Sequence, residues 1–242
     1  MQHRSTFFSV AAVLICCFFL IIPASASVMG SLAIGSGVNT VSVGLTSITW
    51  NGQFQVSATT DLTYDNPSQT LPVGSSGNLV DLTTASTFPV DGFMTFTAAA
   101  DLAFDLLGIG PGSANTTCAG LAVGQSCSVF AGSPFVLTQE STGTEIDLAA
   151  FGTATDNTSD VSSWFGQFST TITAMHGVSG VITPADIQNF FATNPTGEIT
   201  SPYSGTFIAT FTPIPEPSSL LMSVIGGSLI LFAMSRRQSK NR

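Results

Sequence analysis

A chain of 242 residues with 44 % hydrophobic and 8 % charged residues can build one or two domains, but it has few charges for surface helices. Its basic residues all lie at the two ends, and they are Arg4, Arg236, Arg237, Lys240 and Arg242. The stretch between Arg4 and Arg236 holds all 14 acidic residues and no Lys or Arg. This excludes nucleic-acid binding and Lys- or Arg-dependent phosphate chemistry, because phosphates are neutralised by clustered cations.

The first 26 residues have the parts of a secretory signal peptide. A short basic start precedes the run 7–22, which contains no charge. Ala24 and Ala26 supply the small residues that signal peptidase requires at positions −3 and −1. We therefore predict export through the Sec translocon and cleavage after Ala26, with an uncleaved anchor as the alternative. A lipoprotein signal is disfavoured because Cys16 and Cys17 lie inside the apolar run and no small residue precedes them.

The last 30 residues, 213–242, contain three elements in a fixed order. Pro215-Glu216-Pro217 comes first, an apolar stretch follows over 220–234, and Arg236 with Arg237 comes last. The apolar stretch predicts a transmembrane helix, and the Arg pair holds its far end in the cytoplasm. The two prolines disfavour helix, so the tripeptide is predicted to be extended at the outer surface of the inner membrane.

This tail resembles the PEP-CTERM sorting signal, in which the same three elements occur in the same order at the chain end. The resemblance covers about thirty residues. It implies recognition by exosortase, a membrane-embedded enzyme, in Gram-negative bacteria that make exopolysaccharide. It also implies transit through the inner membrane to the cell surface or extracellular matrix, with a role in matrix or biofilm. A plain tail anchor is one alternative. A glycolipid-anchor signal is disfavoured by the terminal basic cluster.

The segment 27–212 is predicted to be one extracytoplasmic domain of mainly β structure. Short runs alternate apolar and polar residues, as in 54–58, 94–98, 146–150, 168–172 and 207–211, and Gly, Asn, Ser and Pro separate them. Period-two alternation is typical of antiparallel sheets with one buried face. Nine or ten such runs predict a two-layer β-sandwich of jelly-roll or immunoglobulin-like type.

One short helix interrupts the strands of this domain. Thr183 is a suitable N-cap, Pro184 fits the first turn, and Asp186 completes a capping box. Asn194 and Pro195 are predicted to end the helix.

Two cysteines remain after signal cleavage, Cys118 and Cys127. In an oxidising compartment a pair nine positions apart predicts one disulfide, and Gly120 and Gly124 let the intervening chain turn. The segment is similar to short cysteine hairpins of immunoglobulin-like bacterial surface domains. A metal site is the alternative, although no His or further Cys is nearby in sequence.

The sequence contains no recognisable set of catalytic residues. His176 is the single His of the mature domain and is expected at the surface in a turn. Two acid pairs, Asp101 with Asp105 and Glu145 with Asp147, are the remaining candidates, since glycoside hydrolysis needs two carboxyl groups. Solvent-facing acids on strands are the simpler interpretation, and no catalytic residue is assigned.

Binding residues are also few. Trp50 and Trp164 could stack on a sugar ring, but core packing is the simpler interpretation. Residues 156–160, Asp-Asn-Thr-Ser-Asp, form an oxygen-rich loop of the kind that binds Ca²⁺, with Asp156 and Asp160 as the candidate ligands. Asx-rich turns with no metal have the same composition, so no metal or other cofactor is assigned.

Two functions remain as hypotheses. The first is a non-enzymatic surface or matrix protein, sorted by exosortase and associated with exopolysaccharide or biofilm. The second is a secreted carbohydrate-binding or carbohydrate-active protein with the same tail. Fold class alone does not separate them.

Overall fold

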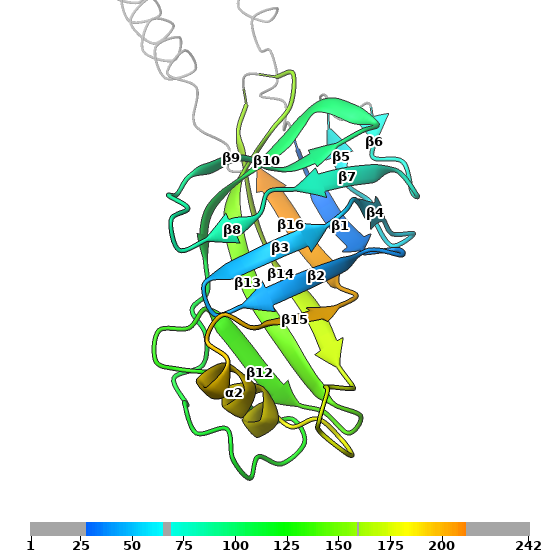
Figure 1. The fold of residues 1–242 in the computed structure, drawn as a ribbon. Coiled ribbons are helices and arrows are strands. Elements are labelled where there is room, and N and C mark those ends of the chain that lie inside the picture. Colours follow the sequence, from blue (N-terminus) through cyan, green and yellow to red (C-terminus); the bar gives the residue numbers. More distant parts are fainter. Residues whose placement is uncertain (1–27, 65–68, 159, 212–242) are drawn as a thin grey trace, which may run out of the picture. The chain divides into compact units, whose positions relative to one another are not determined.

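The computed structural model describes residues 28–64, 69–158 and 160–211 (Figure 1). The predicted signal helix and the predicted transmembrane helix of the tail lie outside these residues. Among the described residues, no helix combines the length and the apolar character needed to cross a membrane.

The largest sheet is antiparallel throughout, and its strands run from the beginning to the end of the described chain. In spatial order they are β10 (Ala99–Ile109), β9 (Val90–Phe96), β7 (Ser76–Leu79), β4 (Phe54–Val56), β1 (Gly30–Gly35), β16 (Ser204–Phe211), β14 (Ser162–Ile172), β13 (Thr144–Thr155), β12 (Phe135–Gln139) and β11 (Ser126–Cys127).

This sheet closes on itself, because β10 at one edge also pairs with β13. The strands from β10 round to β13 therefore form an eight-stranded antiparallel β-barrel. The predicted open two-layer sandwich is wrong. The sheet can close because β13 is long enough to pair with two strands on the same side. Its residues Thr144–Leu148 pair with β12, and Ala150–Thr155 pair with β10. Alternation along a strand is the same in a barrel and in a sandwich, so the sequence pattern did not distinguish them.

A second sheet and a two-stranded ribbon complete the β structure. The second sheet has the order β15 (Glu198–Ser201), β2 (Thr40–Gly44), β3 (Ser47–Asn51) and β8 (Leu82–Thr83), and the ribbon pairs β5 (Thr63–Tyr64) with β6 (Gln69–Thr70). In Figure 1, β2, β3 and β15 lie in front of β13, β14 and β16. Trp50 of β3 contacts Phe168 of β14, with ring centroids 4.7 Å apart. The small sheet thus covers the part of β14 that extends beyond the barrel seam.

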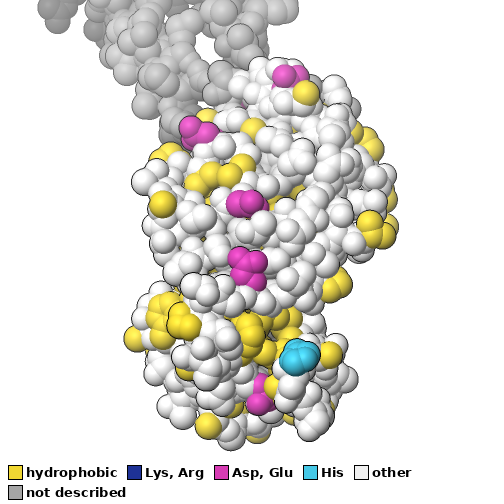
Figure 2. Space-filling view, in the orientation of Figure 1, with side chains coloured by type: hydrophobic (Ala, Val, Ile, Leu, Met, Phe, Trp, Pro, Cys, Tyr) yellow, Lys and Arg dark blue, Asp and Glu magenta, His cyan; other side chains and the backbone are white. Residues whose placement is uncertain are grey.

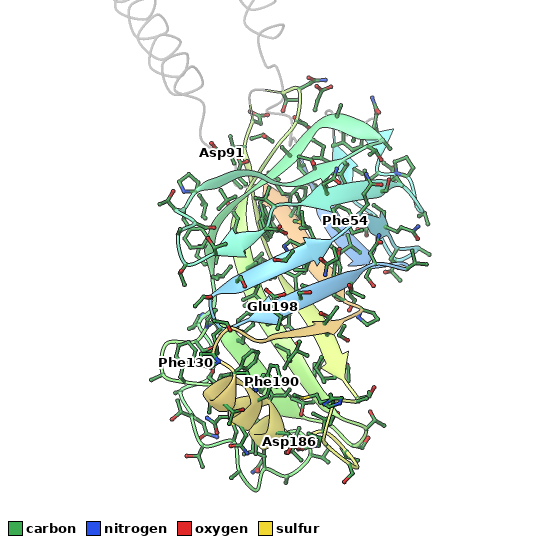
Figure 3. All side chains as sticks on the ribbon, in the orientation of Figure 1. Phe54, Asp91, Phe130, Asp186, Phe190 and Glu198 are labelled. Atoms are coloured by element: carbon green, nitrogen blue, oxygen red, sulfur yellow. A yellow bond between two sulfur atoms is a disulfide. The ribbon has the colours of Figure 1, made fainter. Side chains whose placement is uncertain are left out.

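The core is a continuous series of aromatic rings. Each ring in the series contacts the next, with centroids between 4.7 and 5.7 Å apart. In order, the rings are Phe54, Phe96, Phe104, Trp164, Phe207, Phe168, Trp50 and Tyr203. All eight side chains are buried, and Figure 3 labels Phe54 among the barrel strands. Edge and tilted ring contacts of this kind add to the apolar area removed from water. The barrel interior and the space under the small sheet therefore form one core.

The predicted helix is confirmed as α2 (Pro184–Thr193). Thr183 caps it, and the Thr183 and Asp186 side chains form the expected capping box. Ile187 and Phe191 are buried, while Phe190 and Asp186 are labelled on α2 in Figure 3. The Gln188 side chain donates to the carbonyl of Val129 at 2.8 Å, which ties the helix to the loop before β12.

The barrel seam between β10 and β13 is built around Gly152 and Trp164. Gly152 pairs with Leu106 across the seam and with Trp164 on the other side. The Trp164 indole N–H donates to the carbonyls of Asp105 at 3.0 Å and Thr153 at 3.1 Å. A Cβ on Gly152 would overlap the Asp105 carbonyl oxygen and lie 2.8 Å from Trp164 Nε1. Only glycine lets the indole reach both strands.

Between the small sheet and β12–β14 lies a small cavity, of about 20 Å³, lined by Trp50, Tyr203 and apolar side chains. The Trp50 indole nitrogen and the Tyr203 hydroxyl are buried, and neither has a hydrogen-bond partner among the described residues. Burial raises the pKa of Tyr203 to about 12. A buried polar group with no partner costs free energy, so this is a locally unfavourable feature of the core.

We predict that Gly152→Ala lowers the free energy of unfolding by about 3 kcal/mol, because the added methyl overpacks the seam. Gly35→Ala on β1 is the matched control, since a Cβ there meets nothing within 4 Å. Chemical denaturation of both variants measures the difference. Equal stability of the two variants would contradict the closed seam.

We also predict that Tyr203→Phe raises the free energy of unfolding by about 1 kcal/mol, since it removes a buried hydroxyl that has no partner. Tyr64→Phe is the opposite control, because the Tyr64 hydroxyl donates to Gln69 Oε1 at 3.1 Å. That variant should lose about 1 kcal/mol. A loss in both variants, measured by denaturation, would show that the Tyr203 hydroxyl is satisfied in solution.

Candidate functional site

The outer face of β13, β14, β16 and β1 points away from the aromatic core and carries three cross-strand rows. The middle row, here called the Phe165 row, consists of Phe151, Phe165, Ile208 and Ser31, paired in register across the four strands. Its two neighbours are the Gln167 row, with Ala149, Gln167, Thr206 and Ala33, and the Ser163 row, with Thr153, Ser163 and Thr210. Large apolar side chains thus lie in one row between small or polar residues.

The large side chains of the Phe165 row are well exposed. Phe165 is 55 % exposed, and Phe151 and Ile208 are each 46 % exposed. The ring of Phe151 lies over Gly108 of β10, where a Cβ would come within 2.6 Å of its Cζ. The inward face of the same strands supplies the core, while the outward pairs Phe151–Phe165 and Phe165–Ile208 add cross-strand contacts and leave about half of each side chain exposed.

A hollow of about 500 Å³ lies beside this row. Its lining includes Phe165, Ile208, Gln167, Thr206, Ser31 and Thr59. It forms where the bulky pair Phe165 and Ile208 stands next to the smaller residues of the Gln167 row. Side chains two positions apart on a strand are roughly 6.6 Å apart, which leaves an open groove between the rows.

Thr59 reaches the hollow because the strand beside β1 is interrupted. Between β4 and β5 the Thr60 hydroxyl takes the place of a backbone partner, accepting from the Ala33 N–H and donating to the Ala33 carbonyl, both at 3.0 Å. Thr60 is buried while Thr59 is exposed. The neighbouring Asp61 accepts from the Ser31 hydroxyl at 2.7 Å, and hydrogen bonds from Ser31 lower the pKa of this carboxyl.

A polar cluster borders the hollow on the β13 side. Asp147 accepts from the Ser169 hydroxyl at 2.6 Å and from the Gln167 amide at 2.8 Å. The same amide lies 3.1 Å from Ser169 Oγ. Burial raises the pKa of Asp147, while the two hydrogen bonds oppose the rise. The cluster fixes the position of the Gln167 side chain.

Two carboxylates therefore lie near the hollow, and the stretch between Arg4 and Arg236 contains no Lys or Arg to balance them. On the opposite side of the domain, where the small sheet lies, Figure 2 shows separate acidic side chains, one histidine and no Lys or Arg among the described residues. An anionic ligand would be repelled from such a surface.

Each candidate acid pair lies on a single strand, the first on β10 and the second on β13. Asp101 and Asp105 both bond locally: Asp101 accepts from the Asn157 amide at 2.8 Å, and Asp105 accepts from the Gly92 N–H at 2.6 Å. Glu145 and Asp147 lie two positions apart on one side of β13, where the Asp147 carboxylate accepts from Ser169 and Gln167.

The other candidate residues have structural positions. Trp50 and Trp164 are in the core, 8 % and 1 % exposed, which excludes both from stacking on a sugar. His176 is exposed in the turn closed by the Val178 N–H and the Met175 carbonyl.

The candidate Ca²⁺ loop is held by its own hydrogen bonds. Asp156 Oδ1 accepts from the Thr158 N–H at 2.9 Å and from its hydroxyl at 2.6 Å. Among the described residues no group of three or more His, Cys, Asp or Glu side chains is placed to bind a metal ion.

Cys118 and Cys127 lie at disulfide distance, with their Sγ atoms 1.99 Å and their Cα atoms 5.4 Å apart. Both side chains are buried. The loop that they close continues beside β12, where the Gly124 N–H donates to the Gln139 carbonyl at 2.8 Å. The pair therefore holds the end of the sheet and lies apart from the Phe165 row in the strand order.

Sequence reasoning missed the outer hollow altogether. The alternation through Phe168, Thr170 and Ile172 places Phe165 on the outward phase of the same strand. Ile208 is outward in the same way, since Phe207 and Ala209 are inward. The sequence signal for an outer site was that Phe165 and Ile208, two large apolar residues, alternate with the inward residues of their strands. That they lie side by side depends on the register of β14 with β16.

Comparisons with known proteins give no relative: no family model matches the chain, no curated protein matches its sequence and no solved structure matches its fold. A function for this protein must therefore rest on its sequence and geometry.

The acids of the outer face predict a pH effect on stability. Burial first, and then the charges of Asp147 and Glu140, raise the pKa of Glu145 above its ordinary value of 4.5. The folded protein then holds this proton more tightly than the unfolded chain. The stabilisation is complete below pH 4.5 and is lost as the pH rises through the folded pKa.

Glu145→Gln should therefore be more stable than the natural protein at pH 7, by less than about 1 kcal/mol because the group is only partly buried and solvent screens its interactions. The difference should disappear near pH 3. Glu198→Gln on β15 is the control for net charge. Denaturation midpoints at both pH values measure the effect, and a destabilised Glu145→Gln at pH 7 would contradict it.

Proposed function

We propose that this protein is an exported, non-enzymatic protein of the bacterial envelope, sorted by an exosortase and associated outside the cell with exopolysaccharide or biofilm matrix. The observation that carries the proposal is the tail 213–242, with its tripeptide, apolar stretch and basic end in that order. The signal peptide 1–26 supports the first step. Sec translocon, signal peptidase and exosortase are the proposed partners in transit.

The geometry of the domain ends is consistent with this route. Gly30 at the start of β1 pairs with Ala209 near the end of β16. The described domain therefore begins and ends on two neighbouring, paired strands.

Binding fits the described residues better than catalysis does. Asp61 and Asp147 of the outer face accept hydrogen bonds from neighbouring side chains, and the two tryptophans are buried in the core. What the outer face offers a ligand is exposed aromatic surface, hydroxyls and an amide. This favours a protein that acts by holding matrix material rather than by cutting it.

Replacement of Pro215-Glu216-Pro217 by three alanines tests the proposal. A plain membrane anchor needs the apolar stretch and the basic end but not the tripeptide. We expect the variant to stay in the inner membrane at full length, while the natural protein loses the 25 residues after Pro217 and leaves the membrane. Immunoblots of membrane, surface and medium fractions measure this.

The control variant changes Ser218 and Ser219 to Ala and should be processed normally. Deletion of the host exosortase should trap the natural protein in the same way as the triple substitution. If the alanine variant is shortened and distributed like the natural protein, the tail is only an anchor and the proposed function fails.

A further inference from the structure

The strongest unexplained feature of the molecule is the exposed Phe165 row with its adjoining hollow. Phe165 and Ile208 face away from a core that is already complete, and they pair directly across β14 and β16. Their flanking rows carry hydroxyl, amide and methyl side chains. The apolar strip is therefore only one row wide.

The width of this strip indicates the kind of ligand. Stable protein interfaces bury a broad apolar patch of several hundred Å² on each partner, and one row of side chains does not supply that. A sugar ring has a narrow C–H face, suited to an aromatic ring, and hydroxyls around its rim. A strip of aromatic and aliphatic surface bordered by hydrogen-bonding groups matches that pattern.

The hydrogen-bonding groups are in place beside the strip. Gln167 is fixed by Asp147 and Ser169, while Ser31, Thr59 and Thr206 add hydroxyls to the lining of the hollow. Its volume of about 500 Å³ lies within the range of small-ligand sites. The hollow is open, so a chain longer than one sugar can extend beyond it along the sheet.

Charge selects among polysaccharides. Asp61 bonds to Ser31 at one side of the hollow, and Asp147 bonds to Gln167 at the other. No Lys or Arg occurs between Arg4 and Arg236. Uronate, sulfate or phosphate groups would meet like charge and find no counter-ion.

We propose that the hollow lined by Phe165, Ile208, Gln167 and Thr59 is a binding site for a neutral polysaccharide chain. Phe165 supplies the stacking surface, the Gln167 Oε1 accepts from a sugar hydroxyl, and the hydroxyls of Thr59 and Thr206 bond others. The biological setting rests on the proposed extracellular function, but the binding itself does not depend on the sorting tail.

The test is affinity electrophoresis of the full chain, purified in a polyoxyethylene detergent that carries no sugar headgroup. Gels contain a neutral polymer (hydroxyethylcellulose, dextran, galactomannan or arabinogalactan) or the polyuronate alginate. We expect retardation in at least one neutral gel and none in alginate. Retardation in no neutral gel, or stronger retardation in alginate, overturns the site.

Phe165→Ala should raise the dissociation constant for the retarding polymer at least about tenfold, and Phe165→Trp should retain binding. Phe130→Ala is the matched control, since Phe130 is 44 % exposed but lies in the loop between β11 and β12. Ile208→Ser is the second test should Phe165→Ala fail to fold by circular dichroism. Equal loss in the Phe130 and Phe165 variants overturns the proposal.

Sedimentation velocity tests whether a second copy of this chain, rather than a polysaccharide, occupies the hollow. An oligomer that Phe165→Ala dissociates would make the face a self-interface and overturn the proposal. If the natural protein binds no neutral polymer while its tail is processed normally, only this site is refuted. Normal binding with failed processing refutes only the proposed function.

Discussion

The closed fold depends on one contact, the indole of Trp164 lying over Gly152. Its N–H bonds carbonyls on both β10 and β13, so a side chain of β14 joins the two strands that meet at the seam. The carboxylate of the same Asp105 accepts from the Gly92 N–H of β9. Three neighbouring strands and the seam are thus fixed around one ring. With alanine at position 152, the added methyl would occupy the space between Trp164 and the Asp105 carbonyl. In an open sheet the indole would lose that carbonyl as a hydrogen-bond partner.

The same ring begins the link between the barrel and the small sheet. Phe207 contacts both Trp164 and Phe168, and Phe168 contacts Trp50 beneath β3. The two sheets therefore share a core and are expected to unfold together, since no polar layer separates them. The unpartnered Trp50 and Tyr203 groups lie at the far end of this series. Shape and stacking take precedence over hydrogen bonding at that end.

Local features of the fold could be predicted from the sequence, and non-local ones could not. The capping box at Thr183 and Asp186 depends on residues three apart, and the inward phase of β13 and β14 depends on residues two apart. Closure depends on β10 meeting β13 about fifty residues later, for which alternation carries no information. The candidate site has the same character, because Ser31, Phe165 and Ile208 become one row only through two strand registers.

Closure and site are connected through β1. Its pairing with β16 on one side brings Ser31 and Ala33 into the outer rows, while the Thr60 hydroxyl on its other side interrupts the ladder and turns Thr59 outward. A regular strand there would continue the flat outer face and leave no wall for the hollow. The interruption costs little, because the Thr60 hydroxyl accepts from the Ala33 N–H and the Ala33 carbonyl accepts from the Ser57 N–H. The outer hollow therefore depends on the short pairing of β1 with β4, which ends at Ile34 and Val56.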